Sequence, residues 1–129
     1  MSRPDGADSA ARREARQRGL DAEMWVARTL AAQGWRVVAR NWRGGGAELD
    51  LVVRRHDALR FVEVKARSPS DDIGLEVITE GKRRRLVRGA EAFLAQWDEA
   101  VSEACFAVAF VTVAEDGMRL EWLDDAFDG

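Results

Sequence analysis

The chain has very little of the side chains that build disulfides and histidine-based active sites. Cys105 is its single cysteine, which excludes an internal disulfide framework and a cysteine-rich zinc site. His56 is its single histidine, so a multi-histidine metal site and a Ser/His catalytic triad have little to build on. Any metal chemistry in this chain must therefore use carboxylates.

Long apolar runs are also missing. No stretch approaches the roughly 18 apolar residues that span a bilayer, and residues 1–6 lack the apolar run of a signal peptide. The 129 residues, 47% of them hydrophobic, suit one globular domain. We expect a cytoplasmic protein that does not enter a membrane, with a flexible or frayed tail at residues 1–18 and a single domain at residues 19–129.

The net charge of −3 conceals an uneven distribution. Residues 1–88 contain 19 basic and 13 acidic residues, whereas residues 89–129 contain 1 basic and 10 acidic residues. Such a split suggests that one surface faces a polyanion. Charges that merely solvate the helices would explain the split equally well.

Hydrophobic periodicity and turn residues predict an α/β protein with the order αβββαββ. The first helix is expected to run to about Gln33, with an apolar face made of Leu20, Met24, Ala27, Leu30 and Ala31. The other elements are expected at residues 35–40, 48–54, 59–66, 79–98, 106–114 and 118–122. A helix between two strands implies a crossover to a parallel neighbour, and the central strands form antiparallel hairpins. The prediction is a mixed sheet flanked by helices.

Carboxylates gather on the second and third predicted strands. Because side chains alternate between faces, Glu48 and Asp50 share one face of the first of these strands, and Leu49, Leu51 and Val53 share the other. A tight turn at residues 55–58 would pair Arg54 with Leu59 and place Asp50 opposite Glu63. It would also place Glu48 opposite Lys65.

Opposed, buried carboxylates destabilise a sheet because like charges repel and lose their hydration. A divalent cation such as Mg²⁺, which binds hard oxygen ligands, would remove the conflict at Asp50 and Glu63. The alternative is a structural charge network of Glu48–Lys65 and Asp50–arginine pairs. Lys65 projects in the same direction as Glu63, and its ammonium could offset charge on a phosphate. Glu23, on the first helix, is either a boundary residue or a further ligand.

The pattern Asp50, hairpin, Glu63-Val64-Lys65 resembles the PD-(D/E)xK nuclease signature, and Glu23 matches the helix glutamate of Holliday-junction-resolvase-like members. The fuller pattern resembles the YraN family of small bacterial proteins. The matching elements are Gly19, Glu23, Asn41, Glu48-Leu49-Asp50-Leu51, Phe61-Val62-Glu63-Val64-Lys65-Ala66-Arg67, Gly74, Lys82, Ala90 and Ala126-Phe127. The chain departs from that family at Cys105-Phe106-Ala107, where Arg-Phe-Asp is usual, and at Ala47, where glycine is usual.

The resemblance implies a restriction-endonuclease-like three-layer fold and a DNA endonuclease dependent on Mg²⁺ or Mn²⁺, with branched or flapped DNA in repair or recombination as candidate substrates. It implies Asp50, Glu63 and the backbone carbonyl of Val64 as metal ligands. Lys65 would be the catalytic lysine and Glu23 an accessory acid and additional candidate ligand. Glu48 is a further accessory acid. A homodimer would suit a two-stranded cut.

Basic residues near these strands are candidates for phosphate contact, which positions a nucleic acid without reading its sequence. The candidates are Arg43, Arg67, Lys82, Arg83, Arg84 and Arg85. The alternative for the Lys82–Arg85 run is a solvated helix face. Gly44–Gly46 is interpreted as a flexible hairpin tip, and Trp42 as the tryptophan to test for base stacking. Two other functions stay open, namely a non-catalytic nucleic-acid-binding module and a protein-interaction adaptor.

Overall fold

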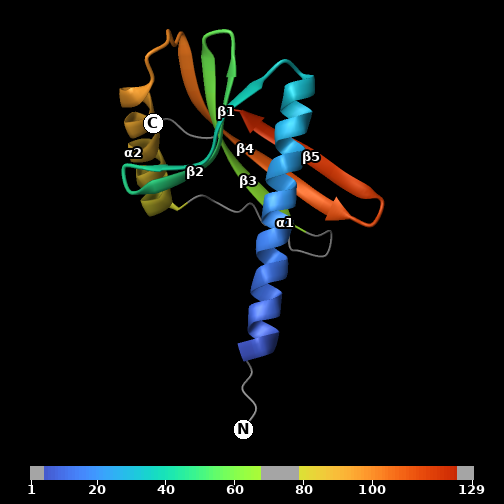
Figure 1. The fold of residues 1–129 in the computed structure, drawn as a ribbon. Coiled ribbons are helices and arrows are strands. Elements are labelled where there is room, and N and C mark those ends of the chain that lie inside the picture. Colours follow the sequence, from blue (N-terminus) through green and yellow to red (C-terminus); the bar gives the residue numbers. More distant parts are fainter. Residues whose placement is uncertain (1–4, 68–78, 125–129) are drawn as a thin grey trace.

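The computed structural model of the chain describes residues 5–67 and 79–124. Its elements, shown in Figure 1, are α1 (Asp5–Ala32), β1 (Arg36–Gly44), β2 (Ala47–Arg55), β3 (Ala58–Arg67), α2 (Glu80–Gln96), β4 (Glu103–Ala114) and β5 (Gly117–Asp124). The predicted order αβββαββ is confirmed. Gly74 and Ala126-Phe127, which contribute to the family resemblance, lie outside the described residues. In the part of the chain that the structure describes, neither helix has the length and apolar character needed to cross a membrane.

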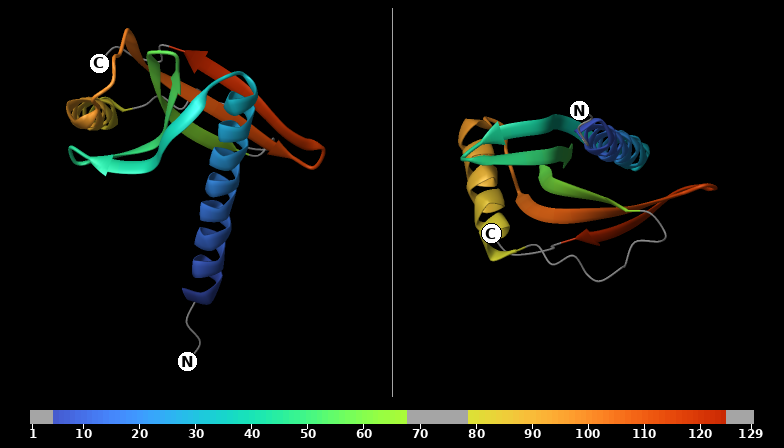
Figure 2. Two further views of the ribbon diagram at one scale, coloured as in Figure 1. Left: turned by 45° about the horizontal axis from the view of Figure 1, so that its top comes forward. Right: turned by 90° about the horizontal axis from the view of Figure 1, so that it is seen from below.

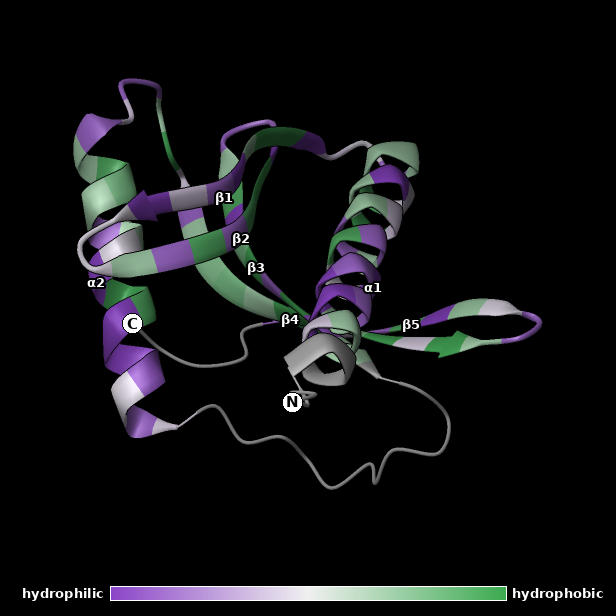
Figure 3. Cartoon of the chain, turned by 60° about the horizontal axis from the view of Figure 1, so that its bottom comes forward, coloured by the Kyte–Doolittle hydropathy of each residue, from purple (hydrophilic) through white to green (hydrophobic). Residues whose placement is uncertain are grey.

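The strands form one mixed sheet in the order β1-β2-β3-β4-β5. Among the strands of the described residues only β3 and β4 pair in parallel, and α2 lies between them in the sequence. One cluster of buried residues joins α1 to one face of the sheet, and a second joins α2 to the other face. Figure 2 shows the sheet between the two helices, and Figure 3 shows where hydrophobic residues follow the strands. This is a three-layer α/β arrangement consistent with a restriction-endonuclease-like fold.

The apolar face predicted for α1 is partly wrong. Leu20 and Met24 are 41% and 43% exposed, whereas Ala22 and Val26 are fully buried in the first cluster. The sequence of α1 carries two neighbouring apolar stripes, and periodicity alone does not choose between them. The small side chain of Ala22 lets the helix approach the sheet closely, so the stripe that contains it packs inward.

The tip of the β1–β2 hairpin is packed against α2. A side chain at Gly45 would place its Cβ 2.5 Å from the carbonyl oxygen of Arg88. A Cβ at Gly89 would lie 3.1 Å from that of Ala47. The expectation of a flexible tip is therefore replaced by a close contact between two backbones. The same bend carries Leu49 into the α2 cluster, away from the face of Leu51 that strict alternation predicted.

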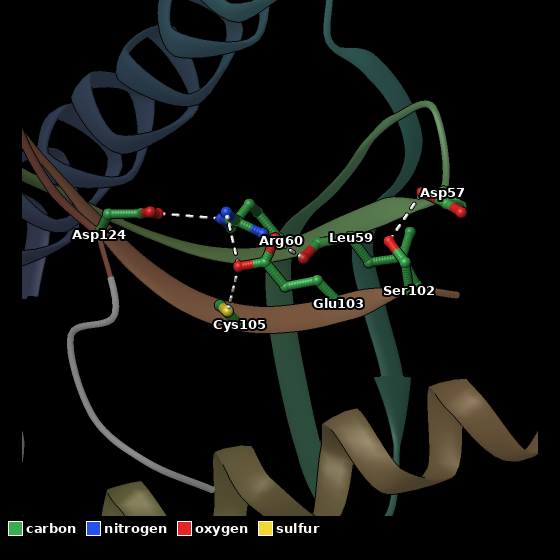
Figure 4. Close-up of polar contacts among 7 residues, drawn as sticks. All are labelled: Asp57, Leu59, Arg60, Ser102, Glu103, Cys105 and Asp124. Carbon is green, nitrogen blue, oxygen red and sulfur yellow. Dashed lines mark hydrogen bonds and ion pairs between the residues drawn. The ribbon is translucent and has the colours of Figure 1, made fainter.

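Arg60 connects β3, β4 and β5. It lies on β3, five residues before Lys65. Its guanidinium donates to Asp124 at 3.0 Å and to Glu103 at 3.4 Å. Figure 4 shows both contacts. Arg60 is buried and its two acid partners are half-exposed, so these ion pairs link β3 to β4 and β5 at the edge of the packed region. Cys105, the single cysteine, is half-buried and donates from Sγ to Glu103 at 3.4 Å.

Candidate functional site

A cleft of about 590 Å³ opens between α1, the β1–β2 hairpin and the start of α2. Both carboxylates and basic side chains line it. Its lining residues are Arg16, Gly19, Leu20, Glu23, Asn41, Arg43, Gly46, Ala47, Glu48, Asp50, Glu63, Lys82, Arg85 and Leu86. The structure thus brings together four predicted acids from α1, β2 and β3 with three predicted basic residues.

The cleft lies where β2 separates from β3. The predicted register holds up to this point, with Arg54 opposite Leu59, and the pairing ends at Leu51 and Val62. Beyond it, Oδ2 of Asp50 accepts a hydrogen bond from the backbone N–H of Val64 at 2.9 Å. A strand residue directs its N–H and C=O to the same edge, so the Val64 carbonyl also faces the gap. The separation therefore exposes the backbone atom that was predicted as a metal ligand.

Because β2 and β3 have separated, Glu48 does not pair with Lys65 as predicted. Glu48 lies opposite Arg43 on β1, and the two side chains form an ion pair at 3.6 Å. Arg43 is highly exposed at the rim of the cleft. A sequence register extended from the turn cannot anticipate where a hairpin bends out of its sheet.

Asp50 and Glu63 both line the cleft, close enough for the charge of Asp50 to act on the Glu63 carboxyl group. Glu63 is only 6% exposed. Its burial, followed by the charge of Asp50, raises the pKa of Glu63 to about 7. Burial also raises the pKa of Asp50, against the opposing effect of the hydrogen bond from Val64. Burial therefore favours the protonated form of both acids.

Two lysines lie near this pair. Lys82 Nζ is 3.2 Å from Oε1 of Glu63, and Thr79 caps α2 by accepting a hydrogen bond from the Lys82 N–H. Lys82, predicted as a phosphate contact, is therefore directed into the acidic centre. Lys65 is half-buried on β3, and its positive charge lowers the pKa of Glu63.

Glu23 enters the cleft from α1. Burial, followed by the negative charge of Asp50, raises the pKa of Glu23 to about 7. With its amide nitrogen turned toward the acids, Asn41 donates to Glu23 and to Glu48, each at 3.2 Å. Asn41 has a φ of 46°, a left-handed conformation that asparagine adopts more readily than most residues. Asn41 therefore connects β1 to the acid on α1.

The other basic residues predicted to contact phosphate differ in their surroundings. Arg85 lines the cleft, Arg83 pairs with Glu80 at 3.9 Å and Arg84 is exposed. The side chain of Arg67 lies outside the described part of the structure. Trp42 packs edge-on against Phe93 with ring centroids 5.3 Å apart, so its indole belongs to the core beside α2.

The donor set fits a hard divalent cation. Asp50, Glu63 and the Val64 carbonyl offer the oxygen ligands that Mg²⁺ prefers, and Mg²⁺ usually takes only one or two carboxylates from the protein. Within residues 5–67 and 79–124 no group of three or more His, Cys, Asp or Glu side chains is arranged so that it could hold a metal ion, so the protein side chains of such a site would be Asp50 and Glu63 alone. The raised pKa values of Glu23 and Glu63 indicate an excess of buried negative charge that a cation would neutralise.

Sequence reasoning assigned no role to three residues that line the cleft. Asn41 was noted only as part of the family pattern, although an asparagine that ends an apolar strand run is a signal for a left-handed backbone. Gly19 faces the cleft from α1, where a Cβ would meet no other atom within 4 Å. Arg16 was placed in the tail, and only the length of α1 brings it to the cleft.

The fold and this cleft define a three-layer α/β protein of the restriction-endonuclease-like type. The chain belongs to the uncharacterised protein family UPF0102, the YraN family, whose model matches residues 22–113. It is 47% identical over 115 residues to a UPF0102 protein of Gloeobacter violaceus, and the alignment covers 85% of this chain and 91% of the relative. It is 41% identical over 133 residues to a UPF0102 protein of Azorhizobium caulinodans, and that alignment covers 99% of this chain and 98% of the relative.

Proposed function

We propose that this protein is a metal-dependent endonuclease that hydrolyses DNA phosphodiester bonds in the cleft between α1 and α2. The observation that carries the proposal is the buried carboxyl group of Glu63 beside the half-buried carboxyl group of Asp50, where β2 and β3 separate. A protein that only bound nucleic acid would gain nothing from two opposed carboxylates that lose their hydration. Active sites are where such unfavourable arrangements are retained.

The charge pattern of the cleft suits a phosphodiester. Acids form its floor, whereas Arg16, Arg43 and Arg85 approach from α1, the hairpin and α2 respectively. Guanidinium groups bind phosphate oxygens with paired donors. A phosphate held between these arginines would lie over the carboxylates, so the rim positions the substrate and the floor supplies the chemistry.

Asp50, Glu63 and the Val64 carbonyl would hold Mg²⁺ or Mn²⁺, which when bound lowers the pKa of water and polarises a phosphoryl oxygen. Lys65 and Lys82 would offset the negative charge that develops on the phosphate. Glu23, whose pKa is raised to about 7, is suited to accept or donate a proton near neutral pH. Asn41 holds the Glu23 carboxyl toward β1.

The test is cleavage of end-labelled duplex, single-stranded, branched and flapped DNA with Mg²⁺ or Mn²⁺. We expect the wild-type protein to cut at least one of these substrates, and Asp50→Ala and Glu63→Ala to abolish the cut while circular dichroism shows a folded protein. Glu91→Ala removes an exposed carboxylate from α2 and serves as the matched control with wild-type activity. Cleavage retained by both purified site variants would contradict the proposal.

If the protein cleaves none of these substrates, its affinity for DNA distinguishes the two other functions. DNA binding with a steep salt dependence and no metal requirement would favour a non-catalytic binding module. An absence of DNA affinity at moderate salt would favour a protein-interaction adaptor that uses the acidic second half of the chain.

A further inference from the structure

The first half of α1 extends beyond the sheet. Figures 1 and 2 show α1 projecting past the strands toward its N-terminal end. The buried residues of α1 begin at Ala22, and every residue from position 11 to position 18 is exposed. Residues 9–18 therefore form a helical arm that is exposed along most of its length.

This arm carries a strong positive charge. Residues 9–18 include four arginines and one acid, Glu14. Like charges four residues apart, such as Arg12 and Arg16, destabilise a helix, and an exposed helix gains no stability from packing. An anionic partner along the arm would reverse the first effect and supply the missing contacts.

Two of these arginines face the same way as the site. Arg16 precedes Glu23 by seven residues and Arg12 precedes it by eleven, and both spacings return to nearly the same face of a helix with 3.6 residues per turn. Arg16 lines the cleft, which confirms the alignment at that position. Gly19 lies on this face between Arg16 and Glu23 and leaves it open. Arg18 lies on the opposite face.

We propose that the arm is a nucleic-acid-binding surface that guides the DNA backbone into the cleft through Arg12 and Arg16. This inference rests on the proposed function and names the path of its substrate. From Glu23 to Arg12 the helix rises about 16 Å, which corresponds to about five base-pair steps of duplex at about 3.4 Å per step. Phosphates on one strand thus meet Arg16 at the cleft and Arg12 further out.

Contacts of this kind fix the position of a nucleic acid without reading its sequence. Each arginine that neutralises a phosphate releases counterions, so its removal lowers the slope of log affinity against log salt concentration by about 0.9 for duplex DNA. A contact surface along the arm is therefore measurable even when the preferred substrate is unknown.

The experiment measures binding of a fluorescent 20-base-pair duplex by fluorescence anisotropy at several salt concentrations, without metal, so that no cleavage occurs. The test variant is Arg12→Ala/Arg16→Ala. The matched control is Arg18→Ala/Arg28→Ala, which removes the same charge from exposed positions on the other side of α1. Alanine favours helix, so both variants are expected to fold.

We expect the test variant to bind about tenfold more weakly at 0.1 M salt and to lose about 2 from the salt slope, whereas the control changes little. Equal weakening in both variants would overturn the proposal, because net charge and not the aligned face would then set affinity. If the test variant binds the duplex as tightly as wild type, and the wild-type protein cleaves DNA, the proposed role of the arm would be overturned while the proposed function would stand. No duplex affinity in the wild-type protein, together with no cleavage, would overturn the proposed function as well.

Discussion

The carboxylate of Asp50 accepts the backbone N–H of Val64 at 2.9 Å, at the position where the next rung of the β2–β3 ladder would lie. A buried N–H without a partner would cost free energy comparable to a lost hydrogen bond. The side chain replaces that rung, so the strands separate without leaving this donor unsatisfied. One residue thus opens the cleft and supplies one of its acids.

The pH dependence of stability follows from the acids in the cleft. Burial raises the pKa of Glu63 and of Glu23 from the ordinary value of 4.5 to about 7. Between these values the folded protein binds more protons than the unfolded chain, so the free energy of unfolding falls as pH rises through this window. We expect the metal-free protein to be more stable at pH 5 than at pH 8 in urea titrations.

Glu63→Gln should stabilise the metal-free protein at pH 8, by on the order of 2 kcal/mol, because it removes a buried charge of the repelling pair. The gain should shrink at pH 5, where Glu63 is already protonated. Glu91→Gln, at an exposed position on α2, is the control and should show neither effect. A variant Glu63→Gln that is less stable than wild type at pH 8 would contradict this account of the site.

The packing of the hairpin tip predicts different effects for two adjacent glycines. Gly45 and Gly46 both have positive φ, 61° and 80°, but only a Cβ at Gly45 meets the Arg88 carbonyl. Gly46→Ala should cost about 1 kcal/mol of backbone strain. Gly45→Ala should cost about 1–3 kcal/mol more because it overpacks the contact with α2. Urea titration of both variants measures the difference, and equal losses would show that the tip does not touch α2.

Two substitutions should distinguish the role of the Asn41 backbone from that of its side chain. Asn41→Gly accepts the φ of 46° but removes the amide that holds Glu23 and Glu48. We expect it to retain most of the stability and to lower DNA cleavage through kcat more than through KM. Asn41→Ala should lose stability as well, by about 1 kcal/mol, because its left-handed backbone is strained. Wild-type kcat in the glycine variant would remove Asn41 from the account.

The sequence predicted the parts of the fold that depend on local pattern. Strong alternation and a tight turn predicted the pairing of Arg54 with Leu59, and apolar spacing predicted an element at residues 79–98, where α2 (Glu80–Gln96) lies. Both features depend on neighbours within a few residues.

Features decided by contacts distant in sequence were not predictable. The bend that carries Leu49 to α2 depends on Gly89, which is forty residues away. The same bend separates Glu48 from Lys65. Similarly, the pairing of Lys82 with Glu63 requires α2 to begin over the end of β3, and no local pattern specifies that position. The candidate acids could be named from spacing, but their partners could not.

The most direct test of the central claim is calorimetric titration of Mn²⁺ into the protein. It is carried out with and without a DNA duplex that the protein does not cleave and whose phosphates can complete the site. We expect wild type to bind Mn²⁺ in the presence of duplex, more tightly at pH 8 than at pH 6, because the ligands must be deprotonated. Asp50→Ala should lose this binding, whereas Glu91→Ala should retain it. Binding that is equal in wild type and Asp50→Ala, or absent from both with duplex present, would contradict a metal-dependent site at Asp50 and Glu63.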